Sequence, residues 1–120
     1  MNFGFDIDGT ISAAPDIFAT IMRSLIAAGH GVHVLSGTGD TVITDHYDRR
    51  REQLAAWGIP YTALKIVCNP HHLQAKADYC REHDIVMMFE DSVPYTRSIM
   101  GNGVTNVVVM GETVLSGRMT

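Results

Sequence analysis

Five short apolar runs, separated by longer amphipathic segments, constrain the fold of this chain more than any other feature. Runs such as "VHVLS", "IVMMF" and "NVVVM" are nearly continuous in apolar character, as is typical of parallel strands covered on both faces. The predicted strands cover residues 2–6, 32–36, 64–68, 85–89 and 105–110.

Each gap between these runs contains a helix signal. The first helix is predicted to begin at Pro15, a favourable first helical position, and Gly29 can end it. The others are predicted over residues 44–57, where Gly58 can end the helix, between 70 and 83, and over 94–100. Strict alternation of strand and helix predicts a three-layer α/β fold, with right-handed crossovers that place helices on both faces of a parallel sheet.

Size and composition narrow the class of protein. A chain of 120 residues with 46% hydrophobic and 18% charged residues predicts a single globular domain over residues 1–120. No apolar run approaches the roughly 20 residues that cross a bilayer, and a net charge of −4 argues against broad nucleic-acid binding. Two cysteines, Cys68 and Cys80, do not form a disulfide framework, so we expect a reducing, cytoplasmic setting.

Acidic residues follow two of the apolar runs. Asp6 and Asp8 lie at the end of the first run in "FDIDGT", and Glu90 and Asp91 lie at the end of the fourth in "FEDS". The carboxyl ends of parallel strands meet at one edge of the sheet, where open α/β folds bind ligands. Four acids at one edge repel one another, which raises pKa values or requires a cation. Mg²⁺ suits such a site, because it binds one or two carboxylates together with a substrate phosphate.

Two simpler interpretations of "DIDG" explain less of the sequence. A calcium loop starting at Asp6 needs Gly at its sixth position and an acid at its twelfth, but these positions hold Ile11 and Ile17. A capped turn explains Asp8 but gives no reason for Asp6.

Further residues at the same edge suit a phosphate group. Ser36, at the end of the second run, offers a hydroxyl, and Gly37 offers an exposed backbone amide. Lys76 can add a positive charge for the same anion. Acids, a hydroxyl and a lysine in this order predict a site for phosphoryl transfer.

These residues resemble the haloacid-dehalogenase-like (HAD) phosphatase superfamily over nearly the whole chain. "FDIDGT" resembles its first motif, "VHVLSG" its second, Lys76 its third and "FEDS" its fourth. The segment "REQLAAWGIPYTALKIV" resembles the one that follows the second motif in small nucleotidase-like members and in the phosphatase part of polynucleotide kinase-phosphatases. The resemblance implies a Rossmann-like core with strand order 5-4-1-2-3.

The resemblance also implies a two-step Mg²⁺-dependent hydrolysis of a phosphomonoester. Asp6 would be the nucleophile that forms an aspartyl-phosphate, and Asp8 the acid and base. The resemblance implies Mg²⁺ bound by Asp6, the main-chain carbonyl of Asp8 and Asp91, with help from Glu90. Substrate phosphate would be bound by Ser36, Gly37 and Lys76. Lys65 is the second candidate for the phosphate-binding lysine, and Lys76 reaches the site only if its helix begins near Leu73.

The sequence departs from larger family members in two ways. About eight residues separate Asp6 from the helix at Pro15, so no cap domain is predicted and the site should be open. The second motif reads "SGTG" and lacks the Arg that often follows its glycine in nucleotidase-like relatives. An open site suits a nucleic-acid end, or a small phosphate ester if a second subunit of a homo-oligomer closes it. No membrane partner is predicted.

Several interpretations stay open. A non-catalytic phosphate-binding or regulatory module could use the same scaffold, whereas the order of residues disagrees with a phospho-accepting signalling domain. The run Arg49, Arg50 and Arg51 is either a solvated helix face or a site that captures substrate phosphate. His71 and His72 follow the third run, where they could bind a metal with Cys68 or contact the leaving group.

Overall fold

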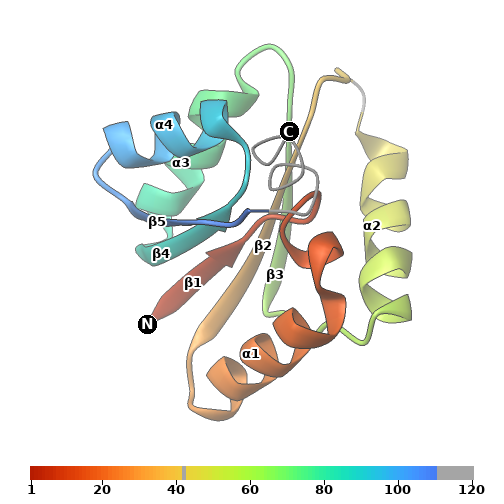
Figure 1. Cartoon of the computed structure of the whole chain (residues 1–120). Helices are drawn as coiled ribbons and strands as arrows, with labels where there is room; N and C mark the ends of the chain where they lie inside the picture. The colour runs from red at the N-terminus through yellow and green to blue at the C-terminus, as the bar shows by residue number, and fades with distance from the viewer. Residues whose placement is uncertain (42, 111–120) are drawn as a thin grey trace, which may run out of the picture.

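The structure, a computed structural model, describes residues 1–41 and 43–110. Strands and helices alternate through this part of the chain (Figure 1). The elements are β1 (Asn2–Phe5), η1 (Ile11–Ala13), α1 (Pro15–Ala27), β2 (Gly31–Thr38), α2 (Thr44–Ala56), β3 (Ala63–Cys68), α3 (His72–Glu82), β4 (Ile85–Glu90), α4 (Val93–Gly101) and β5 (Thr105–Val108).

All five strands are parallel and lie in the order β3-β2-β1-β4-β5. Read from the other edge, this is the predicted order 5-4-1-2-3, which is therefore confirmed. Phe5 of β1 is level with Val34 of β2 and Phe89 of β4. The residues that follow these three positions therefore reach the same edge of the sheet.

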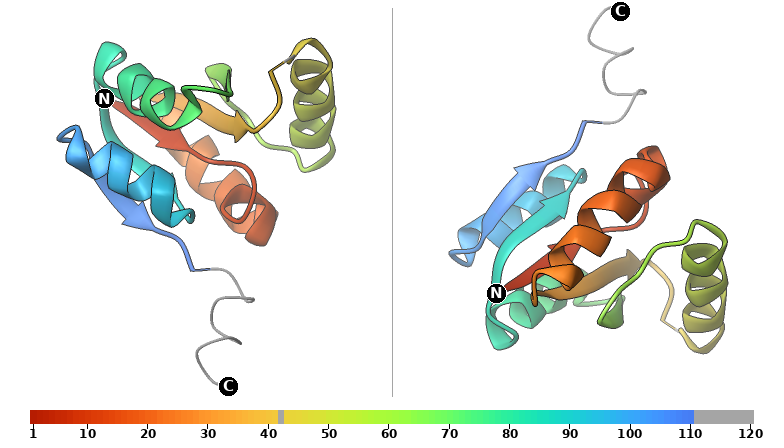
Figure 2. Two further views of the ribbon diagram at one scale, coloured as in Figure 1. Left: turned by 90° about the horizontal axis from the view of Figure 1, so that it is seen from above. Right: turned by 90° about the horizontal axis from the view of Figure 1, so that it is seen from below.

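Helices cover both faces, which confirms the three-layer α/β fold (Figure 2). On one face, α1 and α2 pack over a core that includes Phe5, Phe18 and Leu54. On the other, α3 and α4 pack over a second cluster that includes Ala77 and Ile99. Each layer forms because its helices bury apolar side chains against near-continuous apolar strands.

The predicted boundaries differ from the observed ones by at most two residues. β2 continues through Thr38, two residues beyond the predicted end, because its pairing with β3 extends to Cys68. β1 ends at Phe5, although the Asp6 amide still donates to the Phe89 carbonyl at 3.0 Å. β5 ends at Val108 rather than at residue 110.

The glycines expected to end the first two helices each lie two residues after the last helical residue. Gly29 has φ +87° and Gly58 has φ +65°, the left-handed conformation that favours glycine after a helix. The Gly29 amide donates to the Ile26 carbonyl at 2.9 Å and thereby closes the last turn of α1.

The described connections leave no room for a cap. Only the short η1 helix lies between β1 and α1, so no cap domain covers the edge of the sheet within residues 1–41 and 43–110. None of the helices in these residues combines the length and apolar character that crossing a membrane requires.

Candidate functional site

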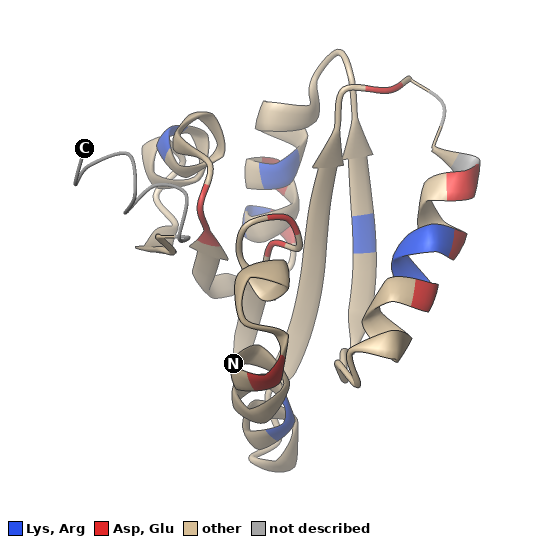
Figure 3. Cartoon of the chain, turned by 45° about the vertical axis from the view of Figure 1, so that its right-hand side comes forward, with Lys and Arg blue, Asp and Glu red and all other residues tan. Residues whose placement is uncertain are grey.

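Three carboxylates meet at the carboxyl end of the sheet. Asp6 directly follows β1, Glu90 is the last residue of β4, and Asp91 comes next. One oxygen of each lies within 4.8 Å of the others. We call these three residues the acidic cluster. Figure 3 shows acidic residues on the loop after β1 and at the end of β4, beside a basic residue on α3.

Lys76 lies against the acidic cluster. Its Nζ is 2.9 Å from Asp6 Oδ1 and 2.6 Å from Glu90 Oε2, and its side chain is fully buried. The contact is made because α3 begins at His72, close to the start near Leu73 that the sequence analysis required. Lys65 instead lies exposed on β3 and lines a hollow with Tyr79 and other residues of α3.

Burial shapes the charges of this site. It raises the pKa of Asp6 from 3.8 to about 8; the Lys76 ammonium opposes the rise and Glu90 adds to it. Burial alone would lower the pKa of Lys76, but Asp6 and Glu90 reverse this, so its pKa is raised and the ammonium persists. The Lys76 ammonium is therefore the positive partner of two carboxyl groups, Asp6 and Glu90.

This donor set fits a hard divalent cation. All the clustered ligands are carboxylate oxygens, as Mg²⁺ prefers, and Mg²⁺ commonly keeps several waters beside one or two carboxylates. Within the described residues, the acidic cluster is the only group of three or more such ligands. The structure therefore does not gather Cys68, His71 and His72 into a metal site.

The turn after Asp6 explains the "DGT" sequence. Gly9 has φ +78°, and a Cβ built there would lie 2.0 Å from Asp91 Oδ2. Glycine therefore permits both the turn and the close approach of Asp91. The Thr10 hydroxyl, fully buried, donates to Asp6 Oδ2 at 3.4 Å. Glycine and threonine thus hold Asp6 and Asp91 beside each other.

The Asp8 carboxylate is not part of the acidic cluster. It is exposed and accepts two hydrogen bonds from Arg50 of α2, at 2.5 Å and 3.2 Å. Arg50 also donates to Gln53 at 2.8 Å. Arg51 instead pairs with Asp48 of the same helix at 3.4 Å. The arginines of the run therefore have different partners, and only Arg50 contacts a predicted site residue.

Ser36 and Gly37, two of the three residues predicted to hold phosphate, lie at the level of the loop after β1. Ser36 is buried and lies on β2 two residues after Val34, the residue that pairs with Phe5 of β1. A Cβ at Gly37 would lie 1.7 Å from the Tyr95 hydroxyl. Glycine at this position therefore leaves the space that the tyrosine occupies.

Tyr95 is the site residue that the sequence analysis missed. The Lys76 Nζ lies 4.2 Å from the centre of its ring, a cation–π contact. His72 packs edge-on against the same ring, with centroids 5.8 Å apart. A signal was available, because Tyr95 follows Asp91 by four residues and so falls in the first turn of the helix at the same edge.

Comparisons with known proteins locate the fold but not a family. No protein-family model matches the chain, and no curated protein matches it. A chain from the structure of a Pnkp1/Rnl/Hen1 complex is similar, with a TM-score of 0.69 and 15% identity over 92% of this chain. This chain spans only 47% of that one. A universal stress protein from Archaeoglobus fulgidus is also similar, with a TM-score of 0.60 and 10% identity over 91% of this chain and 93% of that one. At these identities the similarities show a shared α/β fold.

Proposed function

We propose that this protein is a Mg²⁺-dependent phosphomonoester hydrolase of the HAD phosphatase type, acting through an aspartyl-phosphate on Asp6. The observation that carries the proposal is the meeting of Asp6, Glu90 and Asp91 with Lys76 at the carboxyl edge of the sheet. The order of the four sequence motifs supports it. The shared fold with a chain of the Pnkp1/Rnl/Hen1 complex is consistent with it.

In the first step the Asp6 carboxylate attacks phosphorus. The bond from phosphorus to the ester oxygen breaks, and Asp8 donates a proton to the departing oxygen. In the second step water attacks the aspartyl-phosphate and Asp8 accepts the proton from that water. Free phosphate leaves, and Asp6 is again a carboxylate.

Attack requires Asp6 to be ionised, although burial raises the pKa of its carboxyl. Bound by Asp6, Glu90 and Asp91, Mg²⁺ would favour the ionised form and offset the charge of the phosphoryl group. The Lys76 ammonium also favours the ionised form of Asp6, because it lies 2.9 Å from the Asp6 carboxylate.

The phosphate oxygens would be held by Ser36, the amide of Gly37 and Lys76, next to the nucleophile. Because no cap covers this edge in the described residues, the remainder of the substrate would lie in the open. This arrangement favours a nucleotide or a nucleic-acid end as the substrate.

The test is phosphate release from a panel of phosphomonoesters, measured with Mg²⁺ and with a chelator. Asp6→Asn should reduce turnover by about 10⁴-fold or more, because it removes the nucleophile. Asp16→Asn, a change of an exposed acid in the first turn of α1, is the matched control and should keep full activity. Full turnover in Asp6→Asn, or activity that the chelator does not reduce, would refute the mechanism. Mg²⁺-dependent binding of the esters without release would instead support a non-catalytic phosphate-binding module.

A further inference from the structure

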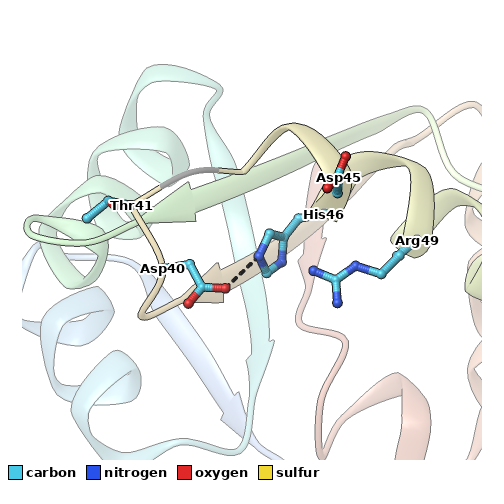
Figure 4. A pocket seen from close by; sticks show the side chains of 5 residues that line it. All are labelled: Asp40, Thr41, Asp45, His46 and Arg49. Atoms are coloured by element: carbon cyan, nitrogen blue, oxygen red, sulfur yellow. Dashed lines mark hydrogen bonds and ion pairs between the residues drawn. The ribbon is translucent and has the colours of Figure 1, made fainter.

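Helix α2 carries a basic hollow beside Asp8. The hollow has a volume of about 400 Å³ and is lined by His46, Arg49, Arg50 and Gln53. We call it the α2 hollow. A neighbouring hollow shares His46 and Arg49 with it, and Figure 4 shows both of these side chains with the Asp40 carboxylate bonded to the imidazole at 2.8 Å.

The α2 hollow adjoins the proposed site through Arg50. The two terminal nitrogens of Arg50 each donate to a different oxygen of Asp8. A phosphate group presents the same pair of oxygens to a guanidinium. Because Asp8 is 65% exposed, its ion pair with Arg50 is of the weak surface kind, which a stronger anion can replace.

Arg49 supplies a second cation. Its guanidinium makes no hydrogen bond or ion pair with any residue in 1–41 or 43–110, and its side chain is exposed on the wall of the hollow. Two acids line the neighbouring hollow with Arg49: Asp40, which pairs with His46, and Asp45, which forms no ion pair with Arg49. An anion in the α2 hollow would therefore meet two guanidinium groups.

The role of Asp8 in the proposed reaction indicates which part of the substrate lies next to the α2 hollow. Asp8 would protonate the leaving oxygen, so the part of the substrate that remains after hydrolysis lies on its side. Arg50 pairs with Asp8 and is therefore next to the group that would protonate the leaving oxygen. The α2 hollow is thus positioned for the leaving group and not for the phosphate that is removed.

We propose that the α2 hollow binds a second phosphate group, carried by the leaving group of the substrate. This proposal rests on the proposed hydrolase function and specifies its substrate class: a nucleoside bisphosphate, or a nucleic-acid end whose next phosphodiester fills the hollow. Binding exchanges the partner of Arg50 from Asp8 to the second phosphate. The exchange frees the Asp8 carboxylate for proton transfer, so the second phosphate raises kcat as well as affinity.

The experiment compares kcat and KM for a nucleoside monophosphate, a nucleoside bisphosphate and a short oligonucleotide with a terminal phosphate. The wild-type protein should prefer one or both of the latter by about tenfold or more in kcat/KM, as expected for charge-assisted hydrogen bonds. Whichever of the two is preferred identifies the source of the second phosphate. Equal kcat/KM for all three compounds would overturn the proposal.

Three variants locate the effect. Arg50→Ala should remove the preference and raise kcat for the monophosphate, because Asp8 is then unpaired. Arg49→Ala, an exposed change that should not disturb folding, should reduce the preference. Arg51→Ala is the matched control, since this arginine is on the same helix but pairs with Asp48. A preference that survives both Arg49→Ala and Arg50→Ala would overturn the proposal.

Direct binding separates this proposal from the catalytic one. Calorimetric titration of Asp6→Asn with the mono- and bisphosphate reports the α2 hollow without turnover. Tighter binding of the bisphosphate that is lost in Asp6→Asn/Arg50→Ala supports the second-phosphate site, even if the wild-type protein releases no phosphate. Equal affinity for both ligands overturns it, even if the wild-type protein is an active phosphatase.

Discussion

Helices α2 and α3 both deliver a basic residue to the loop after β1, but they do so in opposite environments. In α3, Lys76 is fully buried between Asp6 and Glu90, and Ala77 and Cys80 join it in the interior. α2 is more polar, and Arg50 reaches a carboxylate that is 65% exposed. The protein therefore contains an ion pair between a basic side chain and a carboxylate in its interior, at Lys76, and a second one at its surface, at Arg50.

The difference in burial separates two kinds of role. Breaking a buried ion pair leaves a charge without solvent or partner, so Lys76, Asp6 and Glu90 are fixed together. An exposed ion pair exchanges with water and other ions at little cost. The interior pair suits a permanent part of a catalytic centre, and the surface pair suits a contact that a substrate replaces.

The largest effect is expected at Lys76. Lys76→Met should lower the free energy of unfolding by about 3–5 kcal/mol, because two buried carboxylates lose their partner. Urea denaturation followed by circular dichroism measures it. Lys65→Met, which changes an exposed lysine of β3, is the control and should have little effect. A loss below about 1 kcal/mol at Lys76 would place this pair in the same class as the surface pair.

The next largest effects are expected at two glycines, Gly9 beside the acidic cluster and Gly58 after α2. Gly9→Ala should lower the free energy of unfolding by about 1–3 kcal/mol through its positive φ, and should also weaken Mg²⁺ binding, because the new Cβ displaces Asp91. Gly58→Ala shares the positive φ but has nothing within 4 Å. It should therefore cost stability and leave Mg²⁺ affinity intact. Equal Mg²⁺ affinities in a calorimetric titration of both variants would contradict the role given to Asp91.

α3 also closes over a histidine whose charge opposes folding. His33 is buried and bonds to the Tyr79 hydroxyl at 2.8 Å; burial, followed by His83, lowers the pKa of His33 below 6.5. Below pH 6.5 the unfolded state therefore binds more protons at His33, so the contribution of this residue to the free energy of unfolding falls as the pH drops. Asp6 acts in the opposite direction, because its raised pKa makes the folded state bind more protons below about pH 8.

Urea denaturation at pH 7.5 and pH 5 measures this dependence. Relative to the wild-type protein, His33→Gln should be more stable at pH 5 than it is at pH 7.5, whereas His71→Gln, which changes an exposed histidine, should show no such difference. The same slope in all three proteins would show that His33 does not contribute.

The smallest effect on stability is expected at Arg50. Arg50→Ala should change the free energy of unfolding by no more than about 1 kcal/mol, since its partner Asp8 is exposed. Thermal unfolding in low and high salt is the measurement, and any loss should shrink as salt rises. A loss as large as that of Lys76→Met would remove the distinction between the two helices.

Most of the fold could be predicted because its signals are local. Near-continuous apolar strands, Pro15 at the start of α1, and Gly29 and Gly58 after two helices specify the elements with errors of one or two residues at their ends. The extension of β2 to Thr38 had no such signal, since it depends on pairing with β3. Strand order came from the family resemblance and agrees with the structure.

In the candidate site, too, some residues could be predicted from local sequence signals and others could not. Asp6, Glu90 and Asp91 could be brought together from sequence, because residues after parallel strands share one edge. Tyr95 was missed, because its role depends on two tertiary contacts, the approach of its hydroxyl to Gly37 and of its ring to the Lys76 ammonium. The pairing of Arg50 with Asp8 was also beyond sequence analysis, which saw only a run of three arginines.

The sequence by itself determined the α/β alternation and the edge at which the acids collect, because both follow from local periodicity and strand direction. Only the tertiary structure decided which cation serves which acid. That choice depends on the start of α3 at His72, on the burial of Lys76, and on the way α2 turns Arg50 toward the loop after β1. Such distances between remote segments are set by packing, and no short stretch of sequence encodes them.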